Sequence, residues 1–109
     1  MVEYSTTLDA IFHSLADPTR RDLLRRLRPG GQTVGALAEH YSLTFAAVSK
    51  HLQVLETARL VRKRRKGREQ RVELSAAGLR KADKYLEQYR KLWEGRLDRL
   101  ETFIINNKK

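Results

Sequence analysis

The chain has 109 residues, with 23 Lys and Arg against 13 Asp and Glu, so its formal net charge is +10. Hydrophobic residues make up 40% of it, which suits one modest core and a single domain over residues 1–109. No apolar run approaches the ~20 residues of a membrane span, and the N-terminus has no charged and apolar export signal. Cysteine is absent, which excludes disulfides and thiolate chemistry and is compatible with the expected cytoplasmic location.

The first third of the chain has the periodicity of two amphipathic helices. Apolar residues at i, i+3, i+4 and i+7 from Leu8 predict a helix over residues 6–16. Asp17 is a suitable N-cap and Pro18 suits the first helical position, so a second helix is expected to begin there. The sequence RPGG at residues 28–31 ends it.

Residues 33–57 have the pattern of a helix-turn-helix. Thr33 is expected to cap a short helix, and Thr44 caps the next helix after a short turn. On a helical wheel this later helix separates into an apolar stripe and an opposite face that is small, polar and free of acids. The stripe comprises Phe45, Val48, Leu52 and Leu55, and the opposite face comprises Ala46, Ala47, Ser49, Lys50 and Gln53.

A basic hairpin and a long helix are expected to complete the chain. Partial alternation around Gly67 predicts a β-hairpin over residues 60–74 with a tight turn. Seven of the ten residues from 62 to 71 are basic and one is acidic, so the positive charge is concentrated there. Ser75 is expected to cap a last helix over residues 76–104. This order predicts a mainly α fold with a small β-hairpin, a winged helix-turn-helix.

The small polar helix face and the basic hairpin together indicate binding to double-stranded DNA. A helix that enters the major groove approaches base edges and phosphates closely, so bulk and negative charge on that face are unfavourable. Ser49 and Gln53 can exchange hydrogen bonds with bases, and Lys50 can reach a phosphate or guanine. Phe45 lies at the edge of the apolar stripe, and this position favours packing of its ring in the core over contact with a base methyl. The candidate DNA-binding residues are Thr33, Thr44, Phe45, Ala46, Ala47, Ser49, Lys50, Gln53, Arg64, Arg65, Lys66, Gly67 and Arg68.

Each feature also has a simpler interpretation, since small residues pack against neighbouring helices and a basic hairpin can be a solvated turn. The combination favours a sequence-specific, DNA-binding transcriptional regulator. The alternative is a general nucleic-acid-binding or architectural protein with little sequence preference. An enzyme is not expected, because no acid–base pair, metal set or glycine-rich phosphate loop is evident, and no cofactor is implied.

The first and last helices carry more large apolar side chains than a small monomer covers easily. A homodimer formed through residues 6–16 and 76–104 would present two recognition helices about one DNA turn apart, ~34 Å, and would favour an inverted-repeat operator. The alternative is that Leu79 and Ala82 pack within the chain and the rest is an amphipathic tail. The candidate interface residues are Leu8, Ile11, Leu15, Leu86, Tyr89, Trp93, Leu97 and Leu100.

Three segments carry a resemblance to a known family: LADPTRR (15–21), AVSKHLQVLE (47–56) and LVRKRRKGR (60–68). They resemble the ArsR/SmtB family of bacterial winged-helix repressors, and the similarity extends over roughly residues 8–100. It implies a homodimeric repressor that acts on its own or a neighbouring promoter. It also implies dimerisation through the first and last helices and DNA reading by residues 44–53 and the wing. One departure is Arg59, where the family usually has glycine.

A second departure concerns metal sensing. Many relatives use two cysteines at the start of the third helix, where this chain has Thr33 and Gly35. Others use Asp and His on the last helix, and there only Asp83 matches. The three histidines of the chain lie far apart without ligand spacing. The resemblance therefore points to the branch that does not sense metals, with constitutive repression or an unidentified inducer as the alternatives.

Overall fold

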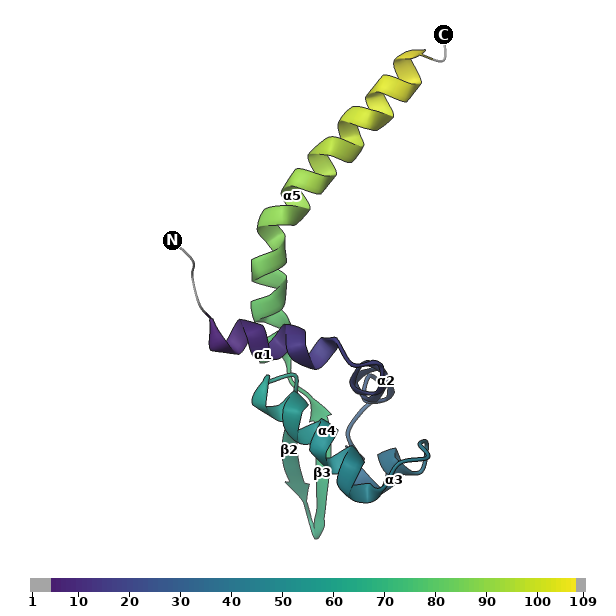
Figure 1. Ribbon diagram of the computed structural model, residues 1–109, viewed down its shortest axis with the longest axis vertical. Helices are drawn as coiled ribbons and strands as arrows, with labels where there is room; N and C mark the ends of the chain where they lie inside the picture. The colour runs from purple at the N-terminus through teal and green to yellow at the C-terminus, as the bar shows by residue number, and fades with distance from the viewer. Residues whose placement is uncertain (1–4, 108–109) are drawn as a thin grey trace.

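A computed structural model of the chain describes residues 5–107, except for the side chains of residues 97, 98 and 107. Four helices and three strands form a body from which the last helix extends (Figure 1). The elements are α1 (Thr6–Leu15), α2 (Pro18–Arg26), β1 (Gln32–Thr33), α3 (Val34–Ala38), α4 (Phe45–Thr57), β2 (Val61–Lys66), β3 (Glu69–Leu74) and α5 (Ala76–Asn107).

Polar side chains fix where the central helices begin. Asp17, Thr33 and Thr44 each accept a hydrogen bond from the backbone N–H three residues further on, at 3.0, 3.1 and 3.1 Å. Each bond satisfies a donor that the first turn of a helix leaves free, and such caps contribute about 1 kcal/mol. The predicted starts of α2, α3 and α4 are confirmed.

The basic hairpin belongs to a three-stranded antiparallel sheet with strand order β1-β3-β2. Strands β2 and β3 pair over their full length, and Gly67 makes the turn with a φ of +63°. This positive φ is the one that the sequence predicts for a tight hairpin. The sequence analysis missed β1, whose Gln32 and Thr33 pair with Val72 and Arg71 of β3. Two residues are too few to show the alternation that reveals a strand.

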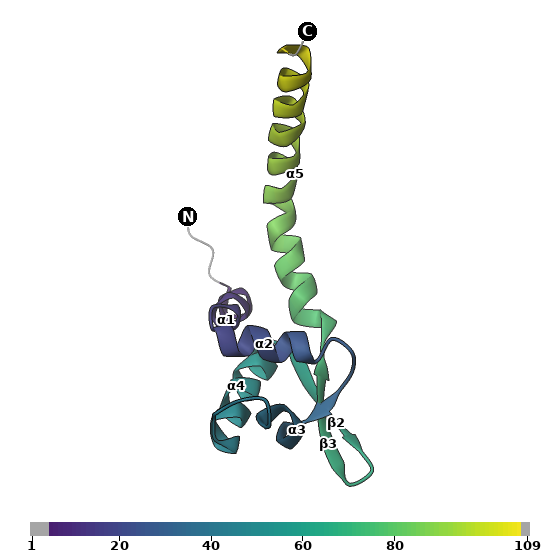
Figure 2. The ribbon, with the colours of Figure 1, turned by 90° about the vertical axis from the view of Figure 1, so that its right-hand side faces the viewer.

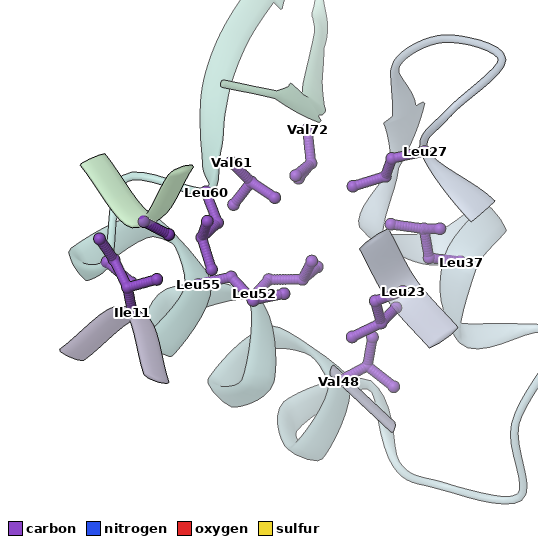
Figure 3. Packing of buried hydrophobic residues seen from close by; sticks show 12 residues of the cluster. Ile11, Leu23, Leu27, Leu37, Val48, Leu52, Leu55, Leu60, Val61 and Val72 are labelled. Carbon is purple, nitrogen blue, oxygen red and sulfur yellow. The ribbon is translucent and has the colours of Figure 1, made fainter. Parts of the chain in front are cut away.

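The core lies where α1, α2, α3 and α4 meet the inner face of the sheet (Figure 3). Burying one leucine, isoleucine or valine side chain stabilises the fold by about 1.5–3 kcal/mol relative to leaving it exposed. The predicted stripe of α4 is confirmed for Val48, Leu52 and Leu55. The buried cluster is Ile11, Leu23, Leu27, Leu37, Val48, Leu52, Leu55, Ala58, Leu60, Val61, Val72 and Ala82.

Phe45 is an exception in this stripe, because the prediction that its side chain packs in the core is wrong. Its side chain is 60% exposed. Phe45 is the first residue of α4, and helical side chains lean toward the N-terminus of their helix. The ring therefore leans beyond the end of α4 instead of lying along the stripe that Val48 continues.

The turn after α4 adopts a conformation that normally requires glycine. Arg59 has a φ of +59°, and its N–H donates to the carbonyl of Glu56 at 2.9 Å. The N–H of Leu60 donates to the carbonyl of Leu55 at 3.0 Å. These two bonds form a Schellman motif, which ends the helix and redirects the chain into β2. Arg59 thus pays the usual steric cost of a left-handed residue, about 1–2 kcal/mol.

The start of α5 packs directly on this turn. The N–H of Gly78 donates to the carbonyl of Arg59 at 2.8 Å. A Cβ atom at residue 78 would lie 2.5 Å from the carbonyl oxygen of Ala58 and 2.7 Å from that of Arg59. Only a residue without a side chain allows α5 to approach this closely.

Helix α5 extends away from the other elements beyond its first turns (Figures 1 and 2). Its 32 residues correspond to about 48 Å at 1.5 Å per residue. Ala82 is buried near α1, whereas the large apolar side chains that the structure describes further along α5 are exposed. None of the described helices, α5 included, has a stretch with both the length and the apolar character of a membrane span.

Candidate nucleic-acid interface

The polar face of α4 is open on the surface of the body. Ala46, Lys50 and Gln53 are exposed, and Ala47 and Ser49 are half-buried. A shallow hollow of about 460 Å³ runs along this face, between Phe45 at the helix start and Gln53. The face carries hydroxyl, amide and ammonium groups without an acidic side chain. It can therefore approach a polyanion closely and exchange hydrogen bonds with it.

The two cap hydroxyls lie at the starts of the two helices of the helix-turn-helix, Thr33 before α3 and Thr44 before α4. Thr33 accepts from the N–H of Ala36 and Thr44 from the N–H of Ala47. A hydroxyl that accepts in this way keeps its own proton to donate. Each threonine can therefore cap its helix and donate to a phosphate oxygen at the same time, although Thr33 is half-buried and Thr44 exposed.

The hairpin projects past the helices as a wing (Figure 2). Its predicted residues Arg64, Arg65, Lys66, Gly67 and Arg68 are all exposed. Because successive strand residues point to opposite faces, the arginines are distributed over both sides of the hairpin. The structure thus brings a basic surface next to α4, and neither element alone provides both the polar helix face and the concentrated charge.

Arg20 of α2 contacts both α1 and α4, and this role was not predicted from the sequence. Its guanidinium donates to the carbonyls of Ser14 at 2.9 Å and His13 at 3.0 Å, at the end of α1. It also lies 3.3 Å from Nδ1 of His51 on α4. The hydroxyl of buried Ser14 donates to the carbonyl of Ala10 at 2.7 Å. These contacts help to fix the position of α4 against α1 and α2. The sequence feature that could have indicated them is the first arginine of the segment DPTRR.

Asp22 connects α2 to the helix-turn-helix, which the sequence analysis also missed. The hydroxyl of Tyr41 donates to its carboxylate at 2.5 Å, and Arg26 donates at 2.8 Å. The Tyr41 hydroxyl, followed by Arg25 and Arg26, holds the pKa of Asp22 well below its usual range. Burial, followed by Asp22, raises the pKa of Tyr41. The carboxylate is therefore ionised at neutral pH and anchors the segment that precedes α4.

The apolar surface of α5 contains most of the predicted dimer-interface residues. Trp93 is 67% exposed, and Leu86, Tyr89 and Leu100 are also exposed. The side chain of Leu97 lies outside the described residues. The predicted interface did not include four further exposed side chains of this helix, although one of them, Ile104, continues the three–four spacing from Leu100. These are Leu92, Phe103, Ile104 and Ile105.

On α1 the structure corrects one predicted interface residue. Ile11 is 0% exposed and belongs to the core of the chain itself, so it has no surface to offer a partner. Leu8 and Leu15 are half-buried. Phe12, which the three–four spacing from Leu8 puts on the apolar face of this helix, is 38% exposed. Its ring makes an edge-to-face contact with that of Tyr85 on α5, with 5.8 Å between the ring centroids.

Metal-ligating side chains do not gather in the part of the chain that the structure describes. Within residues 5–107, no three or more of the His, Asp and Glu side chains are close enough together to hold an ion. His51 has one carboxylate neighbour, Asp17, at 3.9 Å. Thr33 and Gly35 lie at the start of α3, as the resemblance places them.

A polar helix that follows a short turn and stands beside a basic hairpin on a three-stranded sheet defines a winged helix-turn-helix protein. The comparisons with known proteins agree. A family profile described as "Helix-turn-helix domain" matches residues 15–64. The transcriptional repressor SdpR of Bacillus subtilis (strain 168) is 37% identical over 60 residues, which cover 55% of this chain and 67% of that protein.

Two further relatives extend the similarity. The HTH-type transcriptional regulator Rv2034 of Mycobacterium tuberculosis (strain ATCC 25618 / H37Rv) is 44% identical over 71 residues, covering 65% of this chain and 66% of that protein. A crystal structure of an ArsR family transcriptional regulator, RHA00566, superimposes with a TM-score of 0.74 at 33% identity, covering 86% of this chain and 97% of that one. The chain belongs to the ArsR family of winged helix-turn-helix regulators, which are DNA-binding transcriptional regulators and not enzymes.

Proposed function

We propose that this chain is a homodimeric repressor that binds an inverted-repeat operator in the cytoplasm. Residues 33–57 would form the reading unit, residues 60–74 the wing, and residues 6–16 and 76–104 the dimer contact, all within one domain. The observation that carries the proposal is the acid-free polar face of α4 beside the exposed basic wing. The relatives named as repressor and regulators support the same function.

Base recognition is assigned to the α4 face and backbone contact to the wing. Gln53 and Ser49 can hydrogen-bond to base edges, whereas arginines and lysines of the wing neutralise phosphates. Gln53→Ala should therefore cost ~1–3 kcal/mol on the preferred operator and relax the preference at particular base pairs. Replacing Arg65 and Lys66 together by Gln should weaken binding to all duplexes similarly and flatten the salt dependence.

The matched comparison is the ratio of affinities for the preferred and a scrambled duplex, measured by fluorescence anisotropy at 150 mM salt. The Gln53 variant should lower this ratio, and the wing variant should leave it unchanged. Equal proportional losses for both variants on both duplexes would contradict the assignment of roles. Genomic fragments selected with the purified protein would supply the preferred duplex.

The same selection decides between a repressor and an architectural protein. A specific regulator should enrich one short inverted repeat and resist competition by bulk DNA at physiological salt. Enrichment of fragments without a shared motif would favour the general nucleic-acid binder. Repression itself is tested with a reporter behind the enriched promoter, whose expression should rise when the chromosomal copy is deleted.

The dimer part of the proposal is supported by the exposed apolar side chains of α5. Isolated exposed leucines are normal, but a continuous row of this length is typical of an interface. In a homodimer, the row from Leu86 to Leu100 would be buried against a second copy. Trp93→Ala should yield monomers by sedimentation velocity and weaken operator binding, whereas Lys91→Ala, an exposed residue on the opposite side of the same helix, serves as the control. A Trp93 variant that stays fully dimeric would contradict this interface.

Metal-independent repression is part of the proposal. Thr33 and Gly35 offer no soft ligand at the start of α3, since thiolates are absent from the whole chain. Operator affinity should therefore be the same with added Zn²⁺ as with a chelator. A large loss of operator affinity on adding metal would contradict this part of the proposal and show that other residues of the chain sense metal.

A further inference from the structure

The outer face of the sheet is hollowed between β1 and the basic hairpin. Strand alternation turns Val72 into the core, so that Arg71 and Glu73 on either side of it face outward. The hollow has a volume of about 380 Å³, and four of its side chains are basic whereas one is acidic. Its lining consists of Gly31, Arg64, Arg65, Lys66, Arg71 and Glu73.

Two like charges face each other across this hollow. Arg64 of β2 and Arg71 of β3 are direct cross-strand partners. Like charges in this position destabilise a sheet unless an anion lies between or beside them. The one acid of the lining, Glu73, is shared, since Arg62 donates to its carboxylate at 2.5 Å and Arg64 lies 3.8 Å from the same oxygen. The hollow therefore keeps an excess of positive charge.

The guanidinium of Arg71 is poorly satisfied by its neighbours. It donates to the carbonyl of Gly31 at 3.4 Å and to the carboxylate of Glu69 at 3.3 Å. Charge-assisted bonds are normally about 2.7–2.9 Å long. Among the described residues, its Nε is a buried side-chain nitrogen without a hydrogen-bond partner. An incoming acceptor with several oxygens would give this group better bonds than it has now.

We propose that this hollow binds one phosphate of the DNA backbone, with Arg71 as its central ligand. A guanidinium offers a planar fork of donors that matches phosphate oxygens, and Arg64 would hold the same group from the opposite strand. The inference rests on the proposed function, because Arg64, Arg65 and Lys66 belong both to the wing and to the hollow. It adds β3 to the interface, on the face of the sheet that is turned away from the core.

The first test is the salt dependence of operator binding. Each neutralised phosphate contributes about −0.9 to the slope of log K against log salt. Arg71→Gln should therefore flatten the slope by about 0.9, and Arg71→Lys should retain most of it. Arg80→Gln removes the same charge from α5, which begins at the end of β3 opposite the turn, and should leave the slope unchanged. An unchanged slope for Arg71→Gln would overturn the inference.

The second test locates the phosphate. Single methylphosphonate substitutions, which remove the charge of one phosphate, are scanned along the operator duplex. At one position in each half-site the substitution should weaken the wild-type protein but not Arg71→Gln, so that the two losses are not additive. Additive losses at every position would overturn the inference, even if Arg71→Gln binds less tightly.

Stability and free-anion binding separate the remaining interpretations. Removing Arg71 relieves its repulsion with Arg64 but also removes its two long hydrogen bonds, to Gly31 and Glu69, so Arg71→Gln should change the melting temperature little. A clear fall would assign Arg71 a structural role and overturn the inference. Saturable binding of inorganic phosphate, lost in Arg71→Gln and accompanied by additive DNA losses, would assign the hollow to a free anion instead. Failure of the wild-type protein to bind any operator would refute the proposed function itself. Failure of the phosphate proposal alone would instead leave wild-type binding intact and appear only in the comparison with the Arg71 variants.

Discussion

Replacing Gly78 by Ala should destabilise the fold, although Ala is the better helix former. The substitution occurs in the first turn of α5, where intrinsic propensity would favour Ala by about 1 kcal/mol. Against this, the added Cβ would lie 2.5 Å from one backbone oxygen and 2.7 Å from another, which no side-chain movement relieves. Overpacking of this kind costs about 1–3 kcal/mol, and loss of the Gly78–Arg59 hydrogen bond costs about 1 kcal/mol more. The net loss should be about 2 kcal/mol.

Urea unfolding followed by circular dichroism measures this loss, at one fixed protein concentration because association contributes to apparent stability. Gly35→Ala is the matched control, since it lies in α3 and a Cβ there meets no atom within 4 Å. The control should be neutral or more stable by up to about 1 kcal/mol. If Gly78→Ala proves as stable as the control, the close packing of α5 on the α4 turn does not constrain the fold.

Three other substitutions test contacts that hold the recognition helix. Arg59→Gly should stabilise the fold by up to about 1 kcal/mol in urea unfolding, because glycine adopts the positive φ without steric cost. Tyr41→Phe should cost about 1.5 kcal/mol at pH 7 and raise the pKa of Asp22, measurable by NMR titration. Since the folded state lowers that pKa, the contribution of Asp22 is present above about pH 4 and is lost as the pH falls further, so the Tyr41→Phe deficit should shrink there. Arg20→Ala should cost about 2 kcal/mol and lower the melting temperature, whereas Arg28→Ala, at an exposed residue after α2, should change it little; equal effects would contradict the role of Arg20.

Local signals in the sequence were sufficient to predict most elements. Asp17, Thr33 and Thr44 cap helices because short polar side chains next to an apolar periodicity leave few alternatives. Gly67 likewise allows a tight turn that other residues disfavour. Strand β1 could not be predicted, because its two residues become a strand only when β3 lies beside them.

Contacts between distant segments were not predictable in the same way. The three–four spacing from Leu8 puts Ile11 and Phe12 on one apolar face of the helix, but the path of α5 and α4 around α1 decides that the first is buried and the second is exposed. Tyr41 and Asp22 are 19 residues apart, and nothing in either segment alone indicates the bond between them. Arg71 looked like one more basic residue of the hairpin, and its position in the hollow depends on β1. The roles proposed for the α4 face and the wing stay predictions.

The hydrogen bond between Gly78 and Arg59 has a mechanical consequence. It joins the end of the recognition helix to the beginning of the long helix without an intervening flexible loop. In a dimer paired through α5, the crossing angle of the two long helices would then set the separation of the two recognition helices directly. A change of a few degrees at that crossing, whether from a mutation or from a bound molecule, would alter which half-site spacing the protein accepts.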